Sequence, residues 1–443
     1  MRSYLIRRFL LIPFTLLGVT FLVFCITRMV PGGPVEQMLQ QQTIGALAGD
    51  KAALQDASLA DENDVERLEE MFNLQEPIVA AYLQWLGLVP RKMLISKTEL
   101  EADGSGELAL GGEGALLRVQ RKGAALFPVD YSAGSLEDWA SRGWRLSLES
   151  PRDRAERWAR RRHISDERAI ADRAGSPLCR KWRAVAWKRD FCGIAQGNFG
   201  NSYKYNEPVW AMMAQRIPVS LYFGLLGSLI TYAVSIPLGM AKAVFHKSWF
   251  DNLSSTLIFL GYAVPGFALG AVLVVYLGAR FEIFPLCGLT SSDFDQMDLV
   301  GQALDLAHHT ALPLLCYVVP SFAVTTMMMK NNALENLSAD YMRTAIAKGA
   351  GFRRAVIRHA FRNSLIPIIS GLGGLLSVMV GGSILIERVF DIQGFGLLSY
   401  QALMDKDYSL IMGTLLLTSF LLMLGNLIAD TIVAVIDPRI QFK

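Results

Sequence analysis

The sequence predicts a helical membrane protein with six transmembrane helices and one large mixed α/β insert. Composition supports this fold class, since the chain of 443 residues is 52% hydrophobic. The apolar residues also cluster into six nearly charge-free runs, each of roughly the 20 residues with which a helix crosses a ~30 Å hydrocarbon core. The runs are residues 9–30, 219–241, 253–277, 311–329, 365–386 and 409–433. Residues 36–216 are instead polar, charged and rich in turn-forming residues, so they form the insert between the first two spans.

The first apolar run is predicted to be a retained helix and not a cleaved signal peptide. It follows Arg7 and Arg8, as the core of a signal peptide would, but it is as long as a full membrane span. No small-residue cleavage site precedes Pro31. The chain then divides into an N-terminal segment with the first helix (1–35), an extracytoplasmic region (36–216) and a segment with helices two to six (217–443).

The Lys and Arg content of the short loops predicts the orientation in the membrane. Basic residues gather in the N-terminal segment, in the loop at 242–250, where they are Lys242 and Lys247, and most of all in the loop at 330–364. The loop at 278–308 is instead rich in acidic residues. Six spans therefore place both termini and the two basic loops in the cytoplasm and the insert outside.

The insert is predicted to contain two parts. Apolar residues at helical spacing, with Pro77 at a helix start, predict helices within residues 61–86. Residues 87–190 combine short alternating stretches with a basic segment of helical pattern at 151–175, which indicates a small mixed α/β module. Its basic surface with several Trp residues would suit nucleic acid, but a location outside the membrane argues against that partner. Contact with anionic lipid head groups, contact with an acidic protein surface and a plain solvated surface stay open as alternatives.

Two cysteines of this region, Cys179 and Cys192, lie on the side of the membrane where disulfides form in oxidising compartments. They either pair in a disulfide or remain two separate thiols. Their spacing in the sequence is compatible with both.

The sequence contains no recognisable enzyme site. The Gly-rich stretch at 104–115 lacks the Gly-Lys-Ser/Thr ending of a phosphate loop, and the five histidines lack the spacing of a metal cage. Ionisable residues mark proton and ion relays in membranes, and the spans carry few of them. We interpret the main exception, Asp430, as a side chain that pairs or reaches water near the interface, and a role in transport is the alternative. The energy for any transport would therefore come from another protein.

The most informative segment is Tyr341–Pro367, YMRTAIAKGAGFRRAVIRHAFRNSLIP, which carries six Lys or Arg and no acid. The pattern predicts a first helix from a Ser338 cap, with Asp340 in its first turn, to about Lys348. A glycine break and a second helix over 352–363 follow. In the second helix, one side is predicted to be basic and the opposite side apolar. The basic stripe is Arg354, Arg358 and Arg362, and the apolar side is Phe352, Ala355, Val356 and Ala360.

This segment resembles the EAA loop of the permease subunits of ABC importers, in the version found in the oligopeptide, dipeptide and nickel group. That version reads Tyr-x-Arg-Thr-Ala-x-Ala-Lys-Gly, followed by a basic helix that ends in Arg-Asn-x-Leu-x-Pro. The matching residues are Tyr341, Arg343, Thr344, Ala345, Ala347, Lys348, Gly349, Arg362, Asn363, Leu365 and Pro367. The name-giving Glu-Ala-Ala is not present literally, because Arg343-Thr344-Ala345 stands in its place.

The resemblance covers residues 1–86 and 191–443 and is similar to the B-type permease of the group. It includes PGGP after the first span, IPVSLYFGL, ERVFDIQGFG, DKDY and the C-terminal DPRI. PGGPVEQ, IPLGMAKAVF and FDIQGFGLL look closest to the branch that imports microcin C-like peptides. Residues 87–190 exceed what the group usually carries between the first two helices, so the resemblance assigns them no role.

The resemblance implies a multi-pass subunit of the bacterial cytoplasmic (inner) membrane, with the insert in the periplasm. The implied partners are a second homologous permease, two ABC ATPase subunits, an extracytoplasmic substrate-binding protein and membrane lipid. ATP and Mg²⁺ would bind the ATPase subunits, so this chain would carry no cofactor and would not be an enzyme. The loop at 338–365 would couple to the ATPase. The implied coupling residues are Arg343, Thr344, Ala345, Ala347, Lys348, Gly349, Gly351, Arg353 and Arg354, with Ala345, Lys348 and Gly349 expected closest to the ATPase and Arg353 and Arg354 at the rim.

The implied cargo is a peptide or a peptide-like solute, and nickel or another small solute is an alternative on the same scaffold. A membrane anchor that displays the insert without transport is a second alternative, but it does not account for the docking loop. An ion channel would need a polar filter or a ring of acids, and neither is evident in the sequence. The sequence does not identify the residues that contact substrate.

Overall fold

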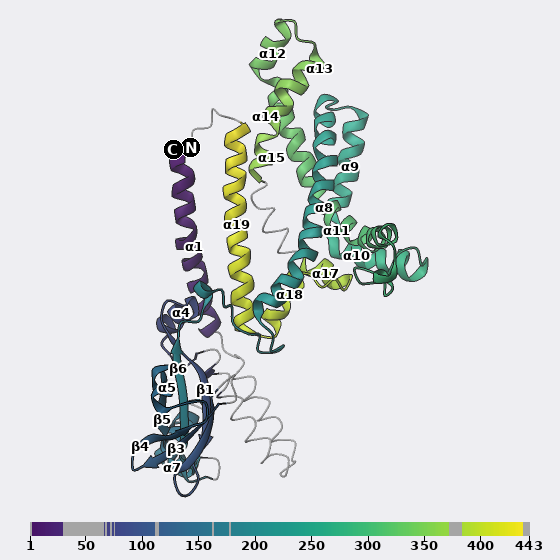
Figure 1. Ribbon diagram of the computed structural model, residues 1–443. Coiled ribbons are helices and arrows are strands. Elements are labelled where there is room, and N and C mark those ends of the chain that lie inside the picture. Colours follow the sequence, from purple (N-terminus) through teal and green to yellow (C-terminus); the bar gives the residue numbers. More distant parts are fainter. Residues whose placement is uncertain are drawn as a thin grey trace. The chain divides into compact units, whose positions relative to one another are not determined.

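The computed structural model describes residues 2–29, 66, 69–70, 73–74, 76–110, 115–161, 164–176, 179–371 and 383–436. The chain folds into two compact units (Figure 1). The helical unit comprises Met1–Val30 and Phe199–Lys443, and the insert unit comprises Pro31–Asn198. The compact insert unit ends at Asn198, and residues 199–216 pack with the helices. The boundary of the extracytoplasmic region at residue 216 stays a prediction.

The helical unit is built from one N-terminal helix and a series that begins after the insert. Its longer helices are α1 (Arg2–Met29), α8 (Val209–Val244), α9 (Trp249–Ala263), α10 (Gly266–Leu273), α11 (Leu299–Ser338), α18 (Phe395–Met404) and α19 (Tyr408–Ile436). The other described elements have eight residues or fewer, and they are η2 (Val274–Arg280), η3 (Phe294–Gln296), α12 (Asp340–Ala347), α13 (Phe352–Ala355), η4 (Val356–Phe361), α14 (Arg362–Ser364), α15 (Ile366–Gly371) and α17 (Ile384–Val389).

Four of the six predicted spans are confirmed as helices that are long and apolar enough to cross a membrane. They are Ile6–Met29, Val209–Val244, Leu299–Ser338 and Tyr408–Val435. The predicted span at 365–386 is helical at both ends, in α15 and α17, but its centre lies outside the described residues. The exact count of six therefore stays a prediction.

The predicted span at 253–277 is not one continuous helix. The structure has two helical segments, Trp249–Ala263 and Gly266–Arg280, which meet at an angle of 85°. The break lies at Val264 and Pro265, and Val264 is extended with φ −93° and ψ 119°. Proline has no backbone N–H to donate and disfavours helical geometry in the residue before it, so an apolar run with this dipeptide bends.

The helices of this unit pack in two groups. Helices α8, α9 and α11 lie side by side, while α1 runs antiparallel to α19 (Figure 1). Arg8 of α1 forms an ion pair with Asp430 of α19, which agrees with the interpretation of Asp430 as a paired residue. The described start of α1, the described end of α19 and the α12–α13 loop lie at the same end of the helices (Figure 1).

Buried carboxylates fix the loops at the opposite end. The fully buried Asp407 accepts hydrogen bonds from the Ser202 hydroxyl at 2.6 Å and from the backbone N–H of Tyr203 at 2.9 Å. Glu387, which is 1% exposed, accepts one from the N–H of Leu397 at 2.6 Å. A buried carboxylate is stable only with such donors, so these bonds hold the segment before α8 and the start of α18 in place.

The insert unit confirms the predicted mixture of strands and helices. Its strands are β1 (Arg91–Glu99), β2 (Ser105–Leu110), β3 (Ala115–Lys122), β4 (Ala125–Tyr131), β5 (Trp144–Glu149) and β6 (Arg183–Asp190). They form two antiparallel three-stranded sheets, ordered β1-β6-β5 and β2-β3-β4. Side chains alternate in β3, where every second residue from Ala115 to Val119 is buried. Both sheets contribute to one apolar core, of which the fully or nearly buried members include Leu100, Leu108, Leu117, Val119, Trp139, Ala184 and Ala186.

Short helices complete this unit. They are α4 (Ile78–Leu86), η1 (Ile194–Gln196), α5 (Leu136–Ser141), α6 (Pro151–Arg161) and α7 (Glu167–Gly175). Helix α4 begins after Pro77, as predicted, and α6 and α7 occupy the basic segment predicted to be helical. Most positions of the helix expected within residues 61–76 lie outside the described residues.

The two cysteines Cys179 and Cys192 are not bonded to each other in the structure. Cys179 precedes β6 and Cys192 follows it, so the two flank an extended strand of eight residues. Eight strand residues span roughly 26 Å, whereas the Cα atoms of a disulfide lie less than about 7 Å apart. The Sγ atom of Cys192 instead accepts a hydrogen bond from the Asn198 side chain at 2.9 Å.

An ion-pair network covers part of the face of sheet β1-β6-β5 that is opposite the core. Arg183, which is 5% exposed, donates to Glu66 at 2.6 Å and lies 2.9 Å from Glu149. Lys97 lies 3.0 Å from Glu66, and Arg157 of α6 lies 2.7 Å from Glu149. The network joins residue 66, within the region that resembles known permeases, to the strands of the additional module.

The network predicts that the insert unit loses stability in acid. Burial alone would raise the pKa of Glu66, but Lys97 and Arg183 outweigh burial and lower that pKa to about 2. Since this lies below the ordinary value of 4.5, the stabilisation is complete above pH 4.5 and is lost as pH falls towards 2. We expect the free energy of unfolding to fall by about 3 kcal/mol over this interval. The measurement is urea unfolding of the full chain in detergent, followed by tryptophan fluorescence at a series of pH values. A Glu66→Gln chain should show a flatter pH dependence, and an unchanged slope would contradict the assignment to Glu66.

Candidate functional site

The basic segment folds into a compact projection beyond the ends of α8, α9 and α11 (Figure 1). We call residues 339–364 the projecting loop. Its first helix, α12, is Asp340–Ala347, close to the predicted range. The predicted Ser338 cap is wrong, because α11 continues to Ser338 and the Ser338 hydroxyl donates to the backbone oxygen of Glu335 at 2.9 Å. Helix α12 follows after a single extended residue, Ala339, which has no side chain for capping.

The predicted glycine break is confirmed at Gly349. The N–H of Gly349 donates to Ile346 at 2.9 Å, and the N–H of Ala350 donates to Ala345 at 3.1 Å. These two bonds form a Schellman motif, which requires a left-handed residue, and Gly349 supplies it with φ +88°. Gly351 has an ordinary φ of −56° and is the N-cap residue of α13, so its backbone does not require glycine.

The second helix of the loop is α13, η4 and α14 in continuous succession. Its centre, η4, is a π-helical turn over Val356–Phe361, a local irregularity that is frequent at functional sites. The predicted apolar side is confirmed for Ala355, Val356 and Ala360, which are buried. It is wrong for Phe352, which lies in the first turn, is 54% exposed and is not part of the buried apolar cluster of the loop.

Apolar packing anchors the projecting loop to the long helices. Met342 of α12 is 1% exposed and shares one buried cluster with residues of the loop's second helix and of α8 and α11. The other buried members are Met240, Ala243, Met329, Ala333, Ala355, Val356, Ala360 and Ile368. Full burial of one methionine side chain stabilises by about 1.5–3 kcal/mol. The packing would therefore resist a displacement of the loop relative to α8 and α11, and a movement of the loop would move these helices with it.

A buried charge network joins the same long helices next to this cluster. Asp251 near the start of α9 is 2% exposed, and its Oδ1 lies 2.7 Å from Lys330 Nζ and 3.2 Å from Lys242 Nζ. Lys242 also donates to the Asp251 backbone oxygen at 2.9 Å and to the hydroxyls of Ser254 and Ser255 at 2.7 and 2.8 Å. One residue from each of α8, α9 and α11 thus meets at a single carboxylate.

The sequence pattern did not predict this network, and the predicted place of Lys242 is wrong. The pattern predicted Lys242 as a loop cation, whereas the side chain lies in the last turn of α8 and is 0% exposed. The signal in the sequence was weak. Asp251, Ser254 and Ser255 stand at the start of one apolar run, and Lys242 and Lys330 stand at the ends of two others. Only the packing of the three helices brings them together.

The outer surface of the projecting loop is mostly exposed and carries most of the predicted coupling residues. Ala345 differs, because it is half-buried and packs against the cluster around Met342. The exposed predicted residues are Arg343, Thr344, Ala347, Lys348, Gly349, Gly351, Arg353 and Arg354. The structure adds three exposed apolar residues that were not predicted to couple, namely Ile346, Phe352 and Ile357.

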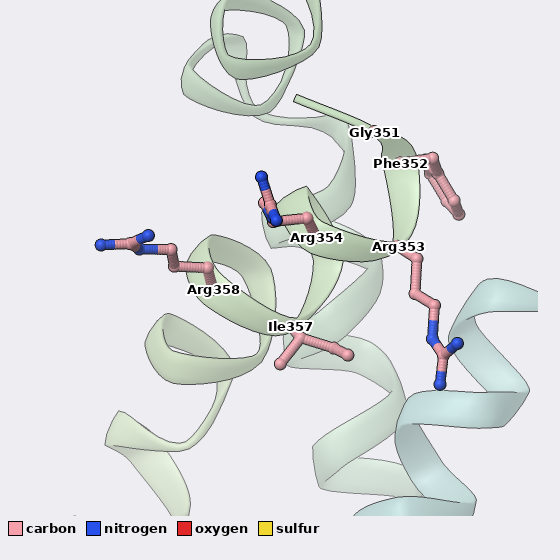
Figure 2. Close-up of a pocket in the computed structure, with 6 residues that line it drawn as sticks. All are labelled: Gly351, Phe352, Arg353, Arg354, Ile357 and Arg358. Atoms are coloured by element: carbon pink, nitrogen blue, oxygen red, sulfur yellow. The ribbon is translucent and has the colours of Figure 1, made fainter. Parts of the chain in front are cut away.

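A shallow pocket lies on the second helix of the loop. Its lining consists of Gly351, Phe352, Arg353, Arg354, Ile357 and Arg358. Arg354 and Arg358 project from one side of the helix, whereas Arg353 points to the other side (Figure 2). Apolar side chains between separated guanidinium groups suit a protein surface that is both apolar and acidic. Among the described residues, no group of three His, Cys, Asp or Glu is placed to hold a metal ion.

Comparison with known proteins assigns the family. A family model described as "Binding-protein-dependent transport system inner membrane component" matches residues 235–442. The inner membrane ABC transporter permease protein YejB of Escherichia coli O157:H7 is 38% identical over 249 residues, which are 56% of this chain and 68% of that relative. The chain belongs to this family. The family is one of membrane transport components and not of enzymes.

Two further relatives are also permease proteins of transport systems. The peptidoglycan transport system permease protein YejB of Agrobacterium fabrum is 38% identical over 56% of this chain and 68% of its own length. The dipeptide transport system permease protein DppB of Lactococcus lactis is 32% identical over 58% of this chain and 80% of its own length. The family match includes the projecting loop and the Asp251 network, but it excludes the sheets of the insert unit.

Proposed function

We propose that this chain is the permease subunit of an ATP-driven ABC importer and forms half of a path for peptides or peptide-like solutes. The observation that carries the proposal is the projecting loop, which exposes a bent, mixed basic and apolar surface and is anchored through Met342 in the core of α8 and α11. A docking element needs both properties, an accessible outer surface and a rigid connection to the helices that move.

The proposed partners are a second homologous permease, two cytoplasmic ATPase subunits and an extracytoplasmic substrate-binding protein. ATP and Mg²⁺ would act on the ATPase subunits. The common end of α1, α19 and the projecting loop would then be the cytoplasmic side of the inner membrane, and the insert would lie in the periplasm. Physically, closure of the ATPase pair would bias the helices between two packed arrangements.

The chemistry of the cargo is proposed from the relatives. The names of two of them specify dipeptide or peptidoglycan transport, so the shared cargo chemistry is that of peptide bonds. The microcin C-like branch stays a prediction. Nickel or another small solute is the second candidate.

Purification of the tagged chain from its native membrane in mild detergent tests this function. We expect ATPase subunits and a second permease to co-purify, and ATP-dependent uptake of a labelled peptide mixture into proteoliposomes that hold the whole complex. Recovery of the chain alone, without uptake, would instead support a membrane anchor.

The bend at Gly349 gives a test of the coupling role. A tryptophan there would occupy a left-handed backbone position, at a strain of about 1–2 kcal/mol, and would place a large side chain on the outer surface. We expect Gly349→Trp to insert into the membrane normally but to lower ATP-driven uptake by about ten-fold or more, a loss of docking energy of about 1.4 kcal/mol. The matched control is Gly123→Trp, at a turn of the insert with φ +64° and equally open space. Normal uptake by the Gly349→Trp complex would reject the assignment of this loop.

A further inference from the structure

The insert unit carries a cationic surface around a single tryptophan. Trp187 lies in β6, the central strand of sheet β1-β6-β5. The register places Arg145 opposite Trp187 and Lys92 opposite Arg189. Because alternate residues of a strand share one face and paired residues point the same way, all four side chains lie on the face opposite the core. We call them the Trp187 patch.

The three cations converge on the indole ring. The Lys92 ammonium lies 5.0 Å from the ring centroid, and the Arg145 and Arg189 guanidinium groups lie at 5.7 and 5.5 Å. The ring itself is held in position by its N–H, which donates to the Ser147 hydroxyl at 3.2 Å. The ring attracts each cation, but the three like charges repel one another.

The cations on this face of the sheet differ in whether they have acidic partners. Towards the start of β6, Arg183 is neutralised by Glu66 and Glu149. In the Trp187 patch, the described part of the chain supplies no acidic partner to any of the three cations. Their local charge is therefore uncompensated, and an anion from outside the chain would stabilise the patch.

Exposed apolar side chains close in sequence to the patch indicate the kind of anion. Leu88, just before β1, is 60% exposed, and Phe191, just after β6, is 53% exposed. Both are within three residues of the strand ends that carry Lys92 and Arg189. Trp with Lys, Arg and exposed apolar residues is the composition of surfaces that lie at a membrane interface. A purely acidic protein surface would not compensate for the exposure of Leu88 and Phe191.

The course of the chain is consistent with this choice. Phe191 is followed after eight positions by Phe199, where the helical unit begins, and eight residues reach at most roughly 28 Å. The span candidate α8 then begins at Val209. The end of the insert that bears the patch is therefore tethered by a short segment to a membrane-spanning unit.

We propose that the Trp187 patch binds the phosphate groups of anionic phospholipids at the membrane surface. Lys92, Arg145 and Arg189 contact the phosphates, Trp187 lies at the level of the head groups, and Leu88 and Phe191 reach the acyl boundary. Each basic residue near an anionic bilayer adds to the electrostatic attraction. The proposal does not depend on transport, because it concerns only the insert and the lipid.

The test uses the full chain in nanodiscs of phosphatidylcholine, with and without phosphatidylglycerol, and with lipids brominated near the head group. The emission of Trp187 is the difference between the wild type and a Trp187→Phe chain. We expect phosphatidylglycerol to cause bromine quenching of most of this emission, and high salt to reverse it. Replacement of Lys92, Arg145 and Arg189 with Gln should abolish the quenching.

The matched control replaces Lys122, Arg160 and Arg168 with Gln, which removes the same charge from other exposed positions of the insert unit. This control should retain the quenching, and circular dichroism should show both triple variants folded. Equal quenching with and without phosphatidylglycerol would overturn the proposal. So would emission that responds to an added acidic substrate-binding protein but not to the lipid. If the wild-type chain shows normal quenching but its complex shows no uptake, the result counts against the transport function and not against the lipid site.

Discussion

Replacement of Asp251 with alanine is expected to destabilise the helical unit by about 3–5 kcal/mol. The variant removes the only carboxylate that the structure places beside Lys242 and Lys330 within the described residues. Lys242 is fully buried, and Lys330 is largely so. Both ammonium groups would remain in the interior without a counter-charge and would repel each other. The measurement is thermal unfolding in detergent, for which we expect a clear fall of the midpoint, together with weaker ATP-driven uptake.

Two further variants separate charge from lost volume at this site. Asp295→Ala removes an exposed acid of the same size and should leave the unfolding midpoint unchanged. A triple variant, Lys242→Met with Asp251→Asn and Lys330→Met, removes all three charges and should recover part of the loss, because apolar replacement of a whole buried network is often tolerated. If the Asp251→Ala chain melts like the wild type, the network does not hold α8, α9 and α11 together.

A single methyl group at Gly239 is expected to have the second large effect. A Cβ atom there would lie 2.6 Å from Met329 Cβ and 2.7 Å from the backbone oxygen of Thr326. Both neighbours belong to α11, and neither can move without the helix. We therefore expect Gly239→Ala to cost about 1–3 kcal/mol through overpacking. The gain of about 1 kcal/mol in helix propensity would offset part of this cost.

The matched control lies on the same helix. A Cβ atom at Gly227 would meet Tyr317 of α11 at 3.6 Å, an ordinary contact distance. Gly227→Ala should therefore leave stability unchanged or raise it slightly, since alanine favours the helix. The comparison consists of thermal midpoints of both variants in the same detergent, with uptake as a second measurement. Equal midpoints for the two alanine variants would contradict a close approach of α8 and α11 at Gly239.

Local signals predicted a large part of the fold and of the candidate site. Hydropathy located four spans to within a few turns, because the length of an apolar run is itself the property that a membrane selects. Glycine predicted the break at Gly349, because a left-handed residue at a helix end is a local backbone requirement. The mixed character of the insert was also predicted, through alternation in segments such as β3 and through the basic helices.

Other features depend on neighbours that are distant in the chain. The sequence did not predict the 85° break at Pro265 as a change of direction, although the proline was visible. It placed Phe352 on the apolar side, because a helical wheel does not show which turns of a helix have a packing partner. It left the state of Cys179 and Cys192 open, and the extended course of β6 separates them.

The sequence by itself determined that this protein is a multi-span helical chain with a bent basic loop and an additional α/β insert. These properties follow from the composition of continuous segments, so the sequence alone predicts them. Only the tertiary structure decided that Lys242, Asp251 and Lys330 meet, and that Lys92, Arg145 and Arg189 surround Trp187. Charges far apart in sequence become one network or one surface only when helices pack or strands pair, since their interaction depends on distance in space.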